Sequence, residues 1–426
     1  MSLRQAQPAG AASTFRALRH RNFRLFWSGQ LISVTGTWMQ SVAQGWLMYR
    51  LTHSPFLLGL LGFTQFLPVL LFSLWAGVIA DRVSKRRLIQ TTQLLCMVQA
   101  LILAMVTTIG IVQPWMVLVL AFVFGTINAF DLPARQSFLV EMVGKEDLTN
   151  AIALNSTAFN TARIAGPAVA GILVAVAGEA GCFWINAVSY LAVLWGLWRM
   201  DLQRGAGETS AADPWGHLRE GVRYAWATPA IRNLLLLLGV MAGLGFQFMV
   251  LLPVYARDIL HTGPEAYGML VSAFGLGSLL SALRLTRRHD RWGLRRNLLV
   301  GLTVAAAGMV SFALSTVLWL SLLAALASGF GLIFYVASTN TLVQLTTEDR
   351  FRGRVMSLYT LMFIGTAPLG ALTVGALAQR AGAPAATTFS GVVLLVGAIW
   401  VAYRLRVLAA REAAAQPSEP APELVH

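Results

Sequence analysis

The chain has 426 residues, of which 57% are hydrophobic and only 12% are charged, and its formal net charge is +14. Soluble domains carry about 25% charged residues, so this composition excludes an ordinary water-soluble globule and indicates a polytopic helical membrane protein. The positive charge does not indicate a nucleic-acid partner, because it follows the topology derived below.

Apolar stretches of about 20 residues recur along the chain, which is the length of a membrane-spanning helix. They predict twelve transmembrane helices. In chain order the predicted spans cover residues 23–49, 56–80, 88–110, 115–134, 152–177, 180–200, 231–254, 266–284, 297–315, 317–341, 354–379 and 384–405.

The basic residues set the expected orientation. Of the 32 lysine and arginine residues, only Arg50, Arg257 and Arg380 lie in loops on one side, and Arg163 lies within a span. The other basic residues lie on the opposite side, which the positive-inside rule assigns to the cytoplasm. We therefore expect a multi-pass protein of the plasma membrane (the inner membrane of a bacterial cell) with both termini in the cytoplasm.

The spans divide the chain into two bundles joined by a polar linker. Within the linker, residues 217–226 are expected to form a short amphipathic helix. The predicted parts are a cytoplasmic segment without a signal peptide (1–22), an N-terminal six-helix bundle (23–200), the linker (201–230), a C-terminal six-helix bundle (231–405) and a disordered cytoplasmic tail (406–426).

One basic signature occurs twice. Asp81-Arg82-Val83-Ser84-Lys85-Arg86-Arg87 follows one apolar run, and Asp290-Arg291-Trp292-Gly293-Leu294-Arg295-Arg296 follows another, with the two aspartates 209 positions apart. Pro167 and Pro368 keep a similar offset of 201. Duplicated halves of this kind are typical of a membrane transporter built from two related bundles.

An acid in a tight turn beside basic side chains can hold helix ends together in one state and release them in another. The alternative is that the basic residues are only topology signals. The gating candidates from the two copies are Asp81, Arg82, Arg86, Arg87, Asp290, Arg291, Arg295 and Arg296.

The first copy, residues 77–87, resembles the loop between the second and third spans of major facilitator superfamily transporters, except that Ser84 stands where that family usually has glycine. The second copy has the glycine at this position but lacks a glycine at the spacing with which Gly77 opens the first copy. Residues 163–171 resemble the fifth-span motif of the family's exporters, with Ala162 and Ala170 in place of two glycines. The resemblance adds Gly166 and Pro167 to the gating candidates, although ordinary helix packing also explains them.

A narrower resemblance covers nearly the whole chain. Residues 131–136, 150–155, 182–190 and 267–270 are similar to the branch that contains enterobactin-type siderophore exporters and related drug-efflux proteins. The resemblance implies an all-α membrane protein with two pseudo-symmetric six-helix bundles. It also implies export of a small molecule in exchange for protons, and it does not name the substrate.

Polar residues in the spans are costly in lipid and therefore informative. The first span carries five of them on one helical face, flanked by Trp38, and this stripe predicts a substrate path because the first, fourth, seventh and tenth spans line the cavity of this fold. Interhelical hydrogen bonding is the alternative. The substrate-binding candidates are Gln30, Ser33, Thr37, Trp38, Gln40, Gln44, Asn128, Asn160, Gln247, Tyr335 and Asn340.

Asp131 is the only acidic residue that the prediction places inside a span. It shares a helix face with Arg135, and Arg163 lies in the next span. These three residues are the proton-coupling candidates. A structural ion pair is an equal alternative for Asp131 and Arg135.

The sequence therefore predicts a monomeric secondary active transporter in the lipid bilayer. It would export an amphipathic small molecule by alternating access, with protons as the coupling ion and Arg163 available for an anionic group. A lipid or lysolipid flippase on the same fold is the main alternative. A polytopic membrane enzyme or a sensor is more remote, because catalytic clusters, cofactor motifs and metal-ligand spacings are missing from the sequence.

Overall fold

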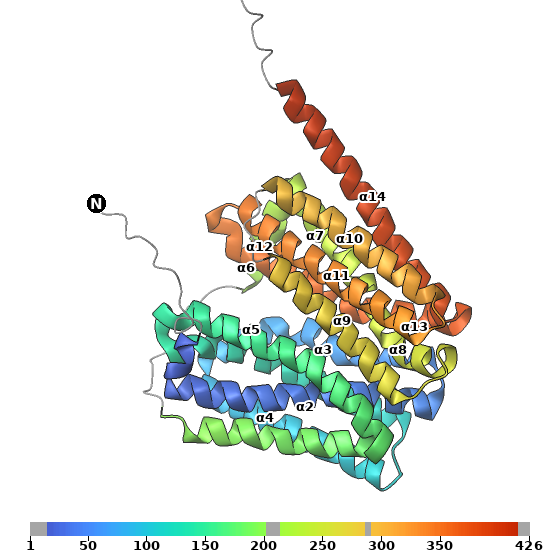
Figure 1. Cartoon of the computed structure of the whole chain (residues 1–426). Helices are drawn as coiled ribbons and strands as arrows, with labels where there is room; N and C mark the ends of the chain where they lie inside the picture. The colour runs from blue at the N-terminus through green and yellow to red at the C-terminus, as the bar shows by residue number, and fades with distance from the viewer. Residues whose placement is uncertain (1–14, 202–213, 286–290, 416–426) are drawn as a thin grey trace, which may run out of the picture.

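The computed structural model describes residues 15–201, 214–285 and 291–415. The first of these ranges forms one group of helices, called here the N half (Figure 1). Its elements are η1 (Arg16–Arg19), α2 (Arg21–Thr52), α3 (Pro55–Arg82), α4 (Lys85–Thr108) and α5 (Pro114–Arg199).

The other two ranges form a second group of helices, called here the C half. The part of this half before the break at residue 286 contains α6 (Pro214–Ala227), α7 (Pro229–Gly245), η2 (Gln247–Leu251), α8 (Leu252–Val254), η3 (Tyr255–Ile259) and α9 (Pro264–Leu285). The remainder contains α10 (Arg291–Leu314), α11 (Leu318–Thr346), η4 (Asp349–Phe351), α12 (Arg352–Gly365), α13 (Ala367–Ala381) and α14 (Ala383–Ala415).

The 86-residue element α5 consists of three helical segments. Gly144 (φ 71°) and Gly178 (φ 71°) break it, since both adopt a left-handed conformation that favours glycine. The first segment covers residues 114–143, the second 145–177 and the third 179–199. The loop predicted between the fourth and fifth spans, residues 135–151, is thus helical except at Gly144, which corrects the sequence-based boundaries.

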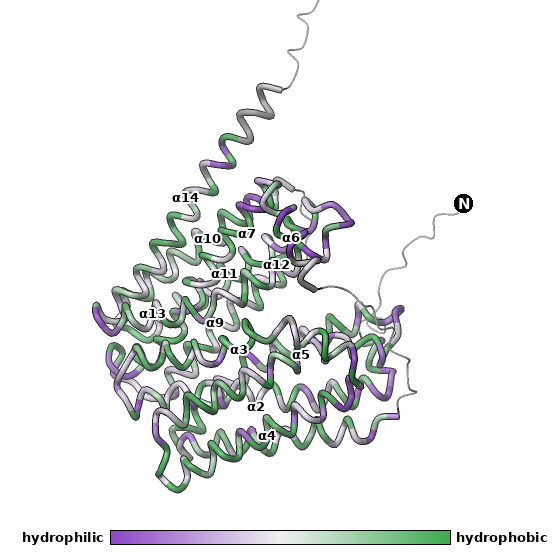
Figure 2. Tube along the Cα trace, turned by 180° about the vertical axis from the view of Figure 1, so that it is seen from behind, coloured by the Kyte–Doolittle hydropathy of each residue, from purple (hydrophilic) through white to green (hydrophobic). Residues whose placement is uncertain are grey.

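Nine helices in the described ranges are long and apolar enough to cross a membrane, and α5 is one of them. The element α2 is not among the nine, because its polar residues lower its mean hydropathy. With α5 counted as three segments and α2 included, the described chain contains the twelve predicted transmembrane helices. Figure 2 shows hydrophobic residues along most of these helices and hydrophilic ones near α6 and other helix ends.

Two predicted spans are irregular. The seventh changes from α-helix to 3-10 helix after Gly245 and ends in a π-helix at Ile259. The eleventh is interrupted at Thr366, the residue directly before α13, and Pro368 lies in the first turn of that helix. At the end of the chain α14 continues to Ala415, so the first ten residues of the segment predicted to be disordered are helical. Their alanine content explains this, since alanine is the strongest helix former.

Two seams join the N half to the C half. Helix α3 packs on α13, and the second segment of α5 packs on α9. Small residues allow each close approach: a Cβ added at Gly375 would lie 2.7 Å from the Gly59 Cα, and one added at Gly268 would lie 2.4 Å from the Pro167 carbonyl oxygen. Gly268 follows Gly59 by 209 positions, the offset that also separates Asp81 from Asp290. The seams are therefore related by the internal repeat.

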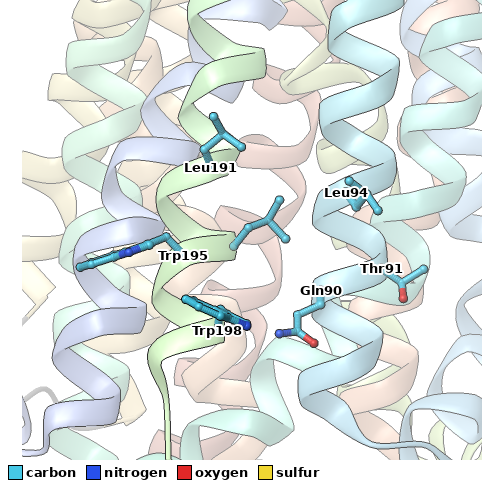
Figure 3. Close-up of a pocket in the computed structure, with 7 residues that line it drawn as sticks. Gln90, Thr91, Leu94, Leu191, Trp195 and Trp198 are labelled. Atoms are coloured by element: carbon cyan, nitrogen blue, oxygen red, sulfur yellow. The ribbon is translucent and has the colours of Figure 1, made fainter.

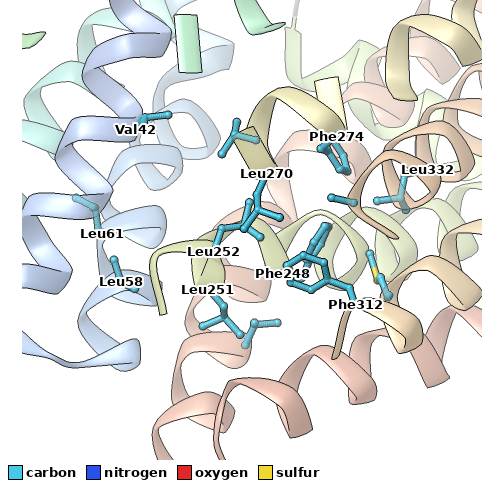
Figure 4. Close-up of a cluster of buried hydrophobic side chains, with 14 of the residues drawn as sticks. Val42, Leu58, Leu61, Phe248, Leu251, Leu252, Leu270, Phe274, Phe312 and Leu332 are labelled. Atoms are coloured by element: carbon cyan, nitrogen blue, oxygen red, sulfur yellow. The ribbon is translucent and has the colours of Figure 1, made fainter. Parts of the chain in front are cut away.

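The polar contacts between the halves gather toward one end of the molecule, called here the closed end. Tyr49 donates a hydrogen bond to Asp258, and Ser54 Oγ donates one to Gln379 Oε1 over 2.8 Å. Deeper in the α5–α9 seam, Ser272 Oγ donates to the carbonyl of Ile164 over 2.8 Å. A buried apolar cluster continues across the halves behind these contacts (Figure 4).

At the opposite end, called here the open end, two ion pairs each lie within one half. Lys85 pairs with Glu141 over 2.5 Å in the N half, and Arg354 pairs with Glu220 over 2.7 Å in the C half. Figure 1 shows the two halves diverging toward this end, where α6 and the start of α12 lie. The structure thus joins its halves at one end and separates them at the other.

Candidate functional site

The polar stripe of α2 faces the interior of the N half. The amide of Gln40 donates to Gln99 Oε1 over 3.0 Å and accepts from Asn186 Nδ2 over 2.8 Å. Gln44 Nε2 donates to the carbonyl of Val117 over 3.3 Å. These partners lie on α4 and on the first and third segments of α5. In this structure Gln40 and Gln44 form the interhelical hydrogen bonds that the sequence left open as the alternative, and their contact with a substrate stays a prediction.

The other members of the stripe are similarly placed. The Thr37 hydroxyl lies 3.2 Å from that of Tyr190 and donates to the carbonyl of Ser33 over 3.0 Å. Ser33 and Gln30 are buried, and Gln30 Oε1 has no hydrogen-bond partner in the described structure. Helical periodicity showed which residues share one face of α2. That face lies against helices of its own half.

Trp38 lies on a different face of α2. Its ring meets Phe159 of the second α5 segment edge to face, with 5.9 Å between the ring centres. A Cβ added at Gly166 would lie 2.7 Å from the Trp38 Cβ. Gly166 therefore contacts α2, while the neighbouring Pro167 carbonyl contacts Gly268 of the C half. The Gly166-Pro167 motif is held between its own half and the opposite one.

Asp131 and Arg135 form a buried ion pair in the first segment of α5. The other carboxylate oxygen of Asp131 accepts from Thr92 Oγ1 over 2.5 Å and from Gln93 Nε2 over 3.2 Å. Asp131 is only 4% exposed. Asn128 shares their helix face but donates to the carbonyl of Phe124 over 3.0 Å instead. The carboxylate is thus fully satisfied by N-half groups, as in a structural ion pair.

Arg163, in the second α5 segment, is different because it has no acidic partner among the described residues. Its guanidinium donates to Asn160 Oδ1 over 2.8 Å, and its Nε is buried without a hydrogen-bond partner. Asn160 in turn donates to the carbonyl of Ser156 over 2.8 Å. A Cβ added at Gly275 of α9 would lie 3.3 Å from the Arg163 carbonyl oxygen. A cation with spare donors therefore lies beside the seam between the halves.

The C-half candidates do not gather into one site. Gln247 is buried in η2, next to Gly370 of α13. Tyr335 is fully buried in α11, and its hydroxyl has no partner in the described structure. Asn340 Oδ1 accepts from Gln344 Nε2 over 2.7 Å within the same helix. Gln247 thus contacts α13, which also packs on α3 of the N half.

The basic loop after α3 contacts its own half. Arg86 Nη2 donates to the carbonyl of Trp198 over 3.1 Å, at the end of α5. Arg82 and Arg87 are exposed. The side chain of Asp81 lies outside the described structure, so the predicted latch of the first copy stays a prediction.

The second basic copy lies largely beyond the described residues. Asp290 falls in the gap before α10, and only the backbone of Arg291 is described. Arg295 is half-buried and Arg296 is exposed. A gating role for these residues also stays a prediction.

Comparison with known families shows to which protein family the chain belongs. Residues 12–425 match the family model described as transmembrane secretion effector. The chain belongs to this family of the major facilitator superfamily.

Two relatives of this chain are named as transporters. The chain is 25% identical over 361 residues to the staphyloferrin A transporter of Staphylococcus aureus, covering 84% of this chain and 89% of the relative. It is 27% identical over 361 residues to the multidrug efflux pump Tap of Mycolicibacterium fortuitum, covering 83% and 88%.

Solved structures of transporters share the fold of this chain. The nucleoside transporter NupG superposes with a TM-score of 0.71 at 12% identity, covering 90% of this chain and 98% of that one. A bacterial homologue of the human lysosomal transporter Spinster, described as inward-facing and occupied, has a TM-score of 0.68 at 13% identity, covering 94% and 98%. The all-α major facilitator fold expected from the sequence is thereby confirmed.

Sequence reasoning missed most of the residues that join the halves. Tyr49, Asp258 and Gly59 are not among the predicted residues, and Gly268 appears only within the motif of residues 267–270, although two signals point to them. Gly59 and Gly268 are separated by 209 positions, and so are Tyr49 and Asp258. A residue that contacts its own equivalent lies near the axis that relates the halves, as Tyr49 and Asp258 do, whereas Gly59 and Gly268 take equivalent places in the two seams.

Proposed function

We propose that this chain is a secondary active exporter that moves an amphipathic small molecule by alternating access, with protons as the coupling ion. The observation that carries the proposal is the asymmetry between the ends of the molecule. The halves are joined through glycine seams and hydrogen bonds at the closed end, and they diverge at the open end. Such an arrangement is what one state of a rocking two-bundle transporter requires.

The open end is proposed to face the cytoplasm. It carries the basic loop from Arg82 to Arg87 and the arginines of α12, and the positive-inside rule favours the cytoplasmic side for such residues. The described structure would then be the inward-facing state of a monomer, ready to accept a solute from the cell.

The proposed solute carries an acidic group. Arg163 supports this because a guanidinium with spare donors lies beside the seam and lacks an acidic partner within the described residues. Charge-assisted hydrogen bonds to a carboxylate would satisfy it. The relatives are named as a staphyloferrin A transporter and a multidrug efflux pump, so a siderophore-like or drug-like solute is consistent with them.

Proton coupling is proposed to involve Asp131, Arg135 or Arg163. The buried pair of Asp131 and Arg135 supports a structural role more directly than a proton-carrying one, since every oxygen of the carboxylate has a partner. Proton binding by Asp131 would have to break this pair during the cycle.

The proposal is tested by flux into proteoliposomes containing the purified protein. Uptake of staphyloferrin A, of the polyanionic dye calcein and of the cation ethidium is measured with an imposed pH gradient. We expect gradient-dependent movement of at least one of them, abolished by an uncoupler. Flux that is unaffected when the gradient is collapsed would refute proton coupling, and no flux of any compound would refute export of this substrate class.

A further inference from the structure

A groove lies on the outside of the N half, between α4 and the third segment of α5. It has a volume of about 580 Å³. Its walls are the side chains of Gln90, Thr91, Leu94, Leu191, Trp195 and Trp198 (Figure 3). None of the contacts described between the two halves involves these residues. In a membrane-spanning bundle, this groove therefore opens toward lipid.

The groove is polar at one end and apolar at the other. Leu94 and Leu191 are 47% and 51% exposed. Figure 3 shows the Trp198 ring and the Gln90 amide below these leucines, toward the start of α4 and the end of α5. Helices α4 and α5 start and end there, at Lys85 and Arg199, so this is the open end of the molecule. Tryptophan is enriched where a bilayer meets water. The change from polar to apolar side chains along the groove therefore matches the change from headgroups to acyl chains within one leaflet.

Three arginines surround the polar end. Arg86 precedes Gln90 by one helical turn and donates to the carbonyl of Trp198 over 3.1 Å. The Arg86 Nε is buried without a hydrogen-bond partner. The guanidinium carbon of Arg199 lies 5.3 Å from the centre of the Trp195 ring. Arg87 is exposed one turn before Thr91. The polar end therefore has a high density of positive charge.

Among the described residues, no acidic side chain pairs with these three arginines. The neighbouring Lys85 does have a partner, Glu141, at 2.5 Å. Three arginines in one place that have no acidic partner within the described residues attract an anion more strongly than an isolated surface pair does.

We propose that this groove binds an anionic glycerophospholipid, with its phosphate beside Arg86 and Arg199 and an acyl chain along Leu94 and Leu191. Charge complementarity identifies the headgroup, and the apolar upper walls identify the chain. The bound lipid would touch Arg86 and the end of the third α5 segment together. The site depends on the membrane fold and is independent of the proposed transport activity.

The experiment is native mass spectrometry of the purified protein titrated with dioleoylphosphatidylglycerol or dioleoylphosphatidylcholine. The wild type is expected to bind the anionic lipid about tenfold more tightly, because both headgroups carry a phosphate but the arginines repel the choline cation of the second. Leu191→Trp fills the groove, and Arg199→Gln removes a charge from an exposed position. Each is expected to abolish the preference for the anionic lipid.

The matched control is Leu372→Trp. It fills a second surface hollow, of about 420 Å³, that is lined by residues of α13 including Arg380 but no tryptophan. This variant is expected to keep the preference for the anionic lipid. Equal affinity of the wild type for the two lipids would overturn the proposal, as would an unchanged preference in Arg199→Gln. Arg199 is exposed, so Arg199→Gln is expected to fold. This variant therefore tests the lipid site even if Leu191→Trp does not fold.

Discussion

The hydroxyl of Tyr49 at the end of α2 donates a hydrogen bond to the carboxylate of Asp258 in η3, across the two halves. The two residues are 209 positions apart, the offset of the internal repeat, so equivalent places in the two halves contact each other. Ser54 and Gln379 add a second polar contact nearby. The hydrogen bond between Tyr49 and Asp258 therefore joins the halves at the closed end in this structure.

Tyr49→Phe should therefore shift the conformational equilibrium. A hydrogen bond to a charged group contributes about 1.5–3 kcal/mol, so its loss should raise the population with the closed end opened by about tenfold or more. The measurement is the distance distribution between spin labels at Gln113 and Arg380, one on each half, in a variant without Cys96 and Cys182.

The control for the Tyr49–Asp258 hydrogen bond is Arg50→Gln. Arg50 follows Tyr49 in the chain, but its partner Glu179, at 2.7 Å, belongs to the same half. The control should leave the spin-label distances unchanged. If Tyr49→Phe and Arg50→Gln give the same distances as the wild type, the Tyr49–Asp258 bond does not hold the closed end.

Gly268→Leu should prevent the α5–α9 seam from closing. A Cβ there would lie 2.4 Å from the Pro167 carbonyl oxygen and 3.0 Å from the Gly171 Cα, and backbone cannot move aside as a flexible side chain can. Overpacking costs about 1–3 kcal/mol, so the closed-end contacts should open and flux should fall about tenfold or more. The readouts are proteoliposome flux and the same spin-label distances.

The matched variant is Gly353→Leu, where an added Cβ meets nothing within 4 Å. It lies in the exposed first turn of α12, and its flux should equal that of the wild type. Normal flux in Gly268→Leu would show that this seam does not need to close during transport.

Hydropathy predicted the spans because the cost of exposing backbone to lipid makes each crossing a long apolar helix. It misplaced the loop of residues 135–151, since a helix that extends beyond the bilayer becomes polar without ending. Only Gly144, with its positive φ, interrupts it. Charge and polarity mark where a helix leaves the apolar layer, whereas a glycine break marks where the helix stops.

The candidate site was less predictable for a different reason. Periodicity showed that Gln40 and Gln44 share a face of α2, but a single sequence does not show which helices that face meets. The structure gives them Gln99, Asn186 and Val117 of the same half as partners. Arg163 was predictable because a charge within a span is rare, but only the structure shows that its partner is Asn160 and that its Nε has none.

The pair of Asp131 and Arg135 permits a direct test of its role. If it is structural, Asp131→Asn and Arg135→Gln should each lower stability by about 3–5 kcal/mol, because each leaves a buried group unpaired. The double variant should be more stable than the sum of the single effects predicts. Thermal unfolding in detergent, followed by tryptophan fluorescence, measures all four proteins.

A proton-carrying role for Asp131 predicts a different pattern. Asp131→Asn would then unfold at the wild-type temperature but would lose pH-driven flux while keeping exchange of solute without a gradient. Additive stability effects in the double variant would likewise argue against a structural pair.

Arg163→Gln should weaken recognition of anionic solutes selectively. The guanidinium now bonds only Asn160, so an acidic group on the solute would supply charge-assisted bonds whose loss raises KM about tenfold or more, whereas a cationic solute gains nothing from them. KM for calcein and for ethidium is measured in proteoliposomes, with Arg163→Lys expected to restore part of the calcein affinity. Arg232→Gln is the control, since that guanidinium stacks on Trp226 outside the seam, 5.6 Å from the ring centre, and should change neither KM. An equal loss for both dyes in Arg163→Gln would mean that Arg163 maintains the seam between the halves and does not bind the solute.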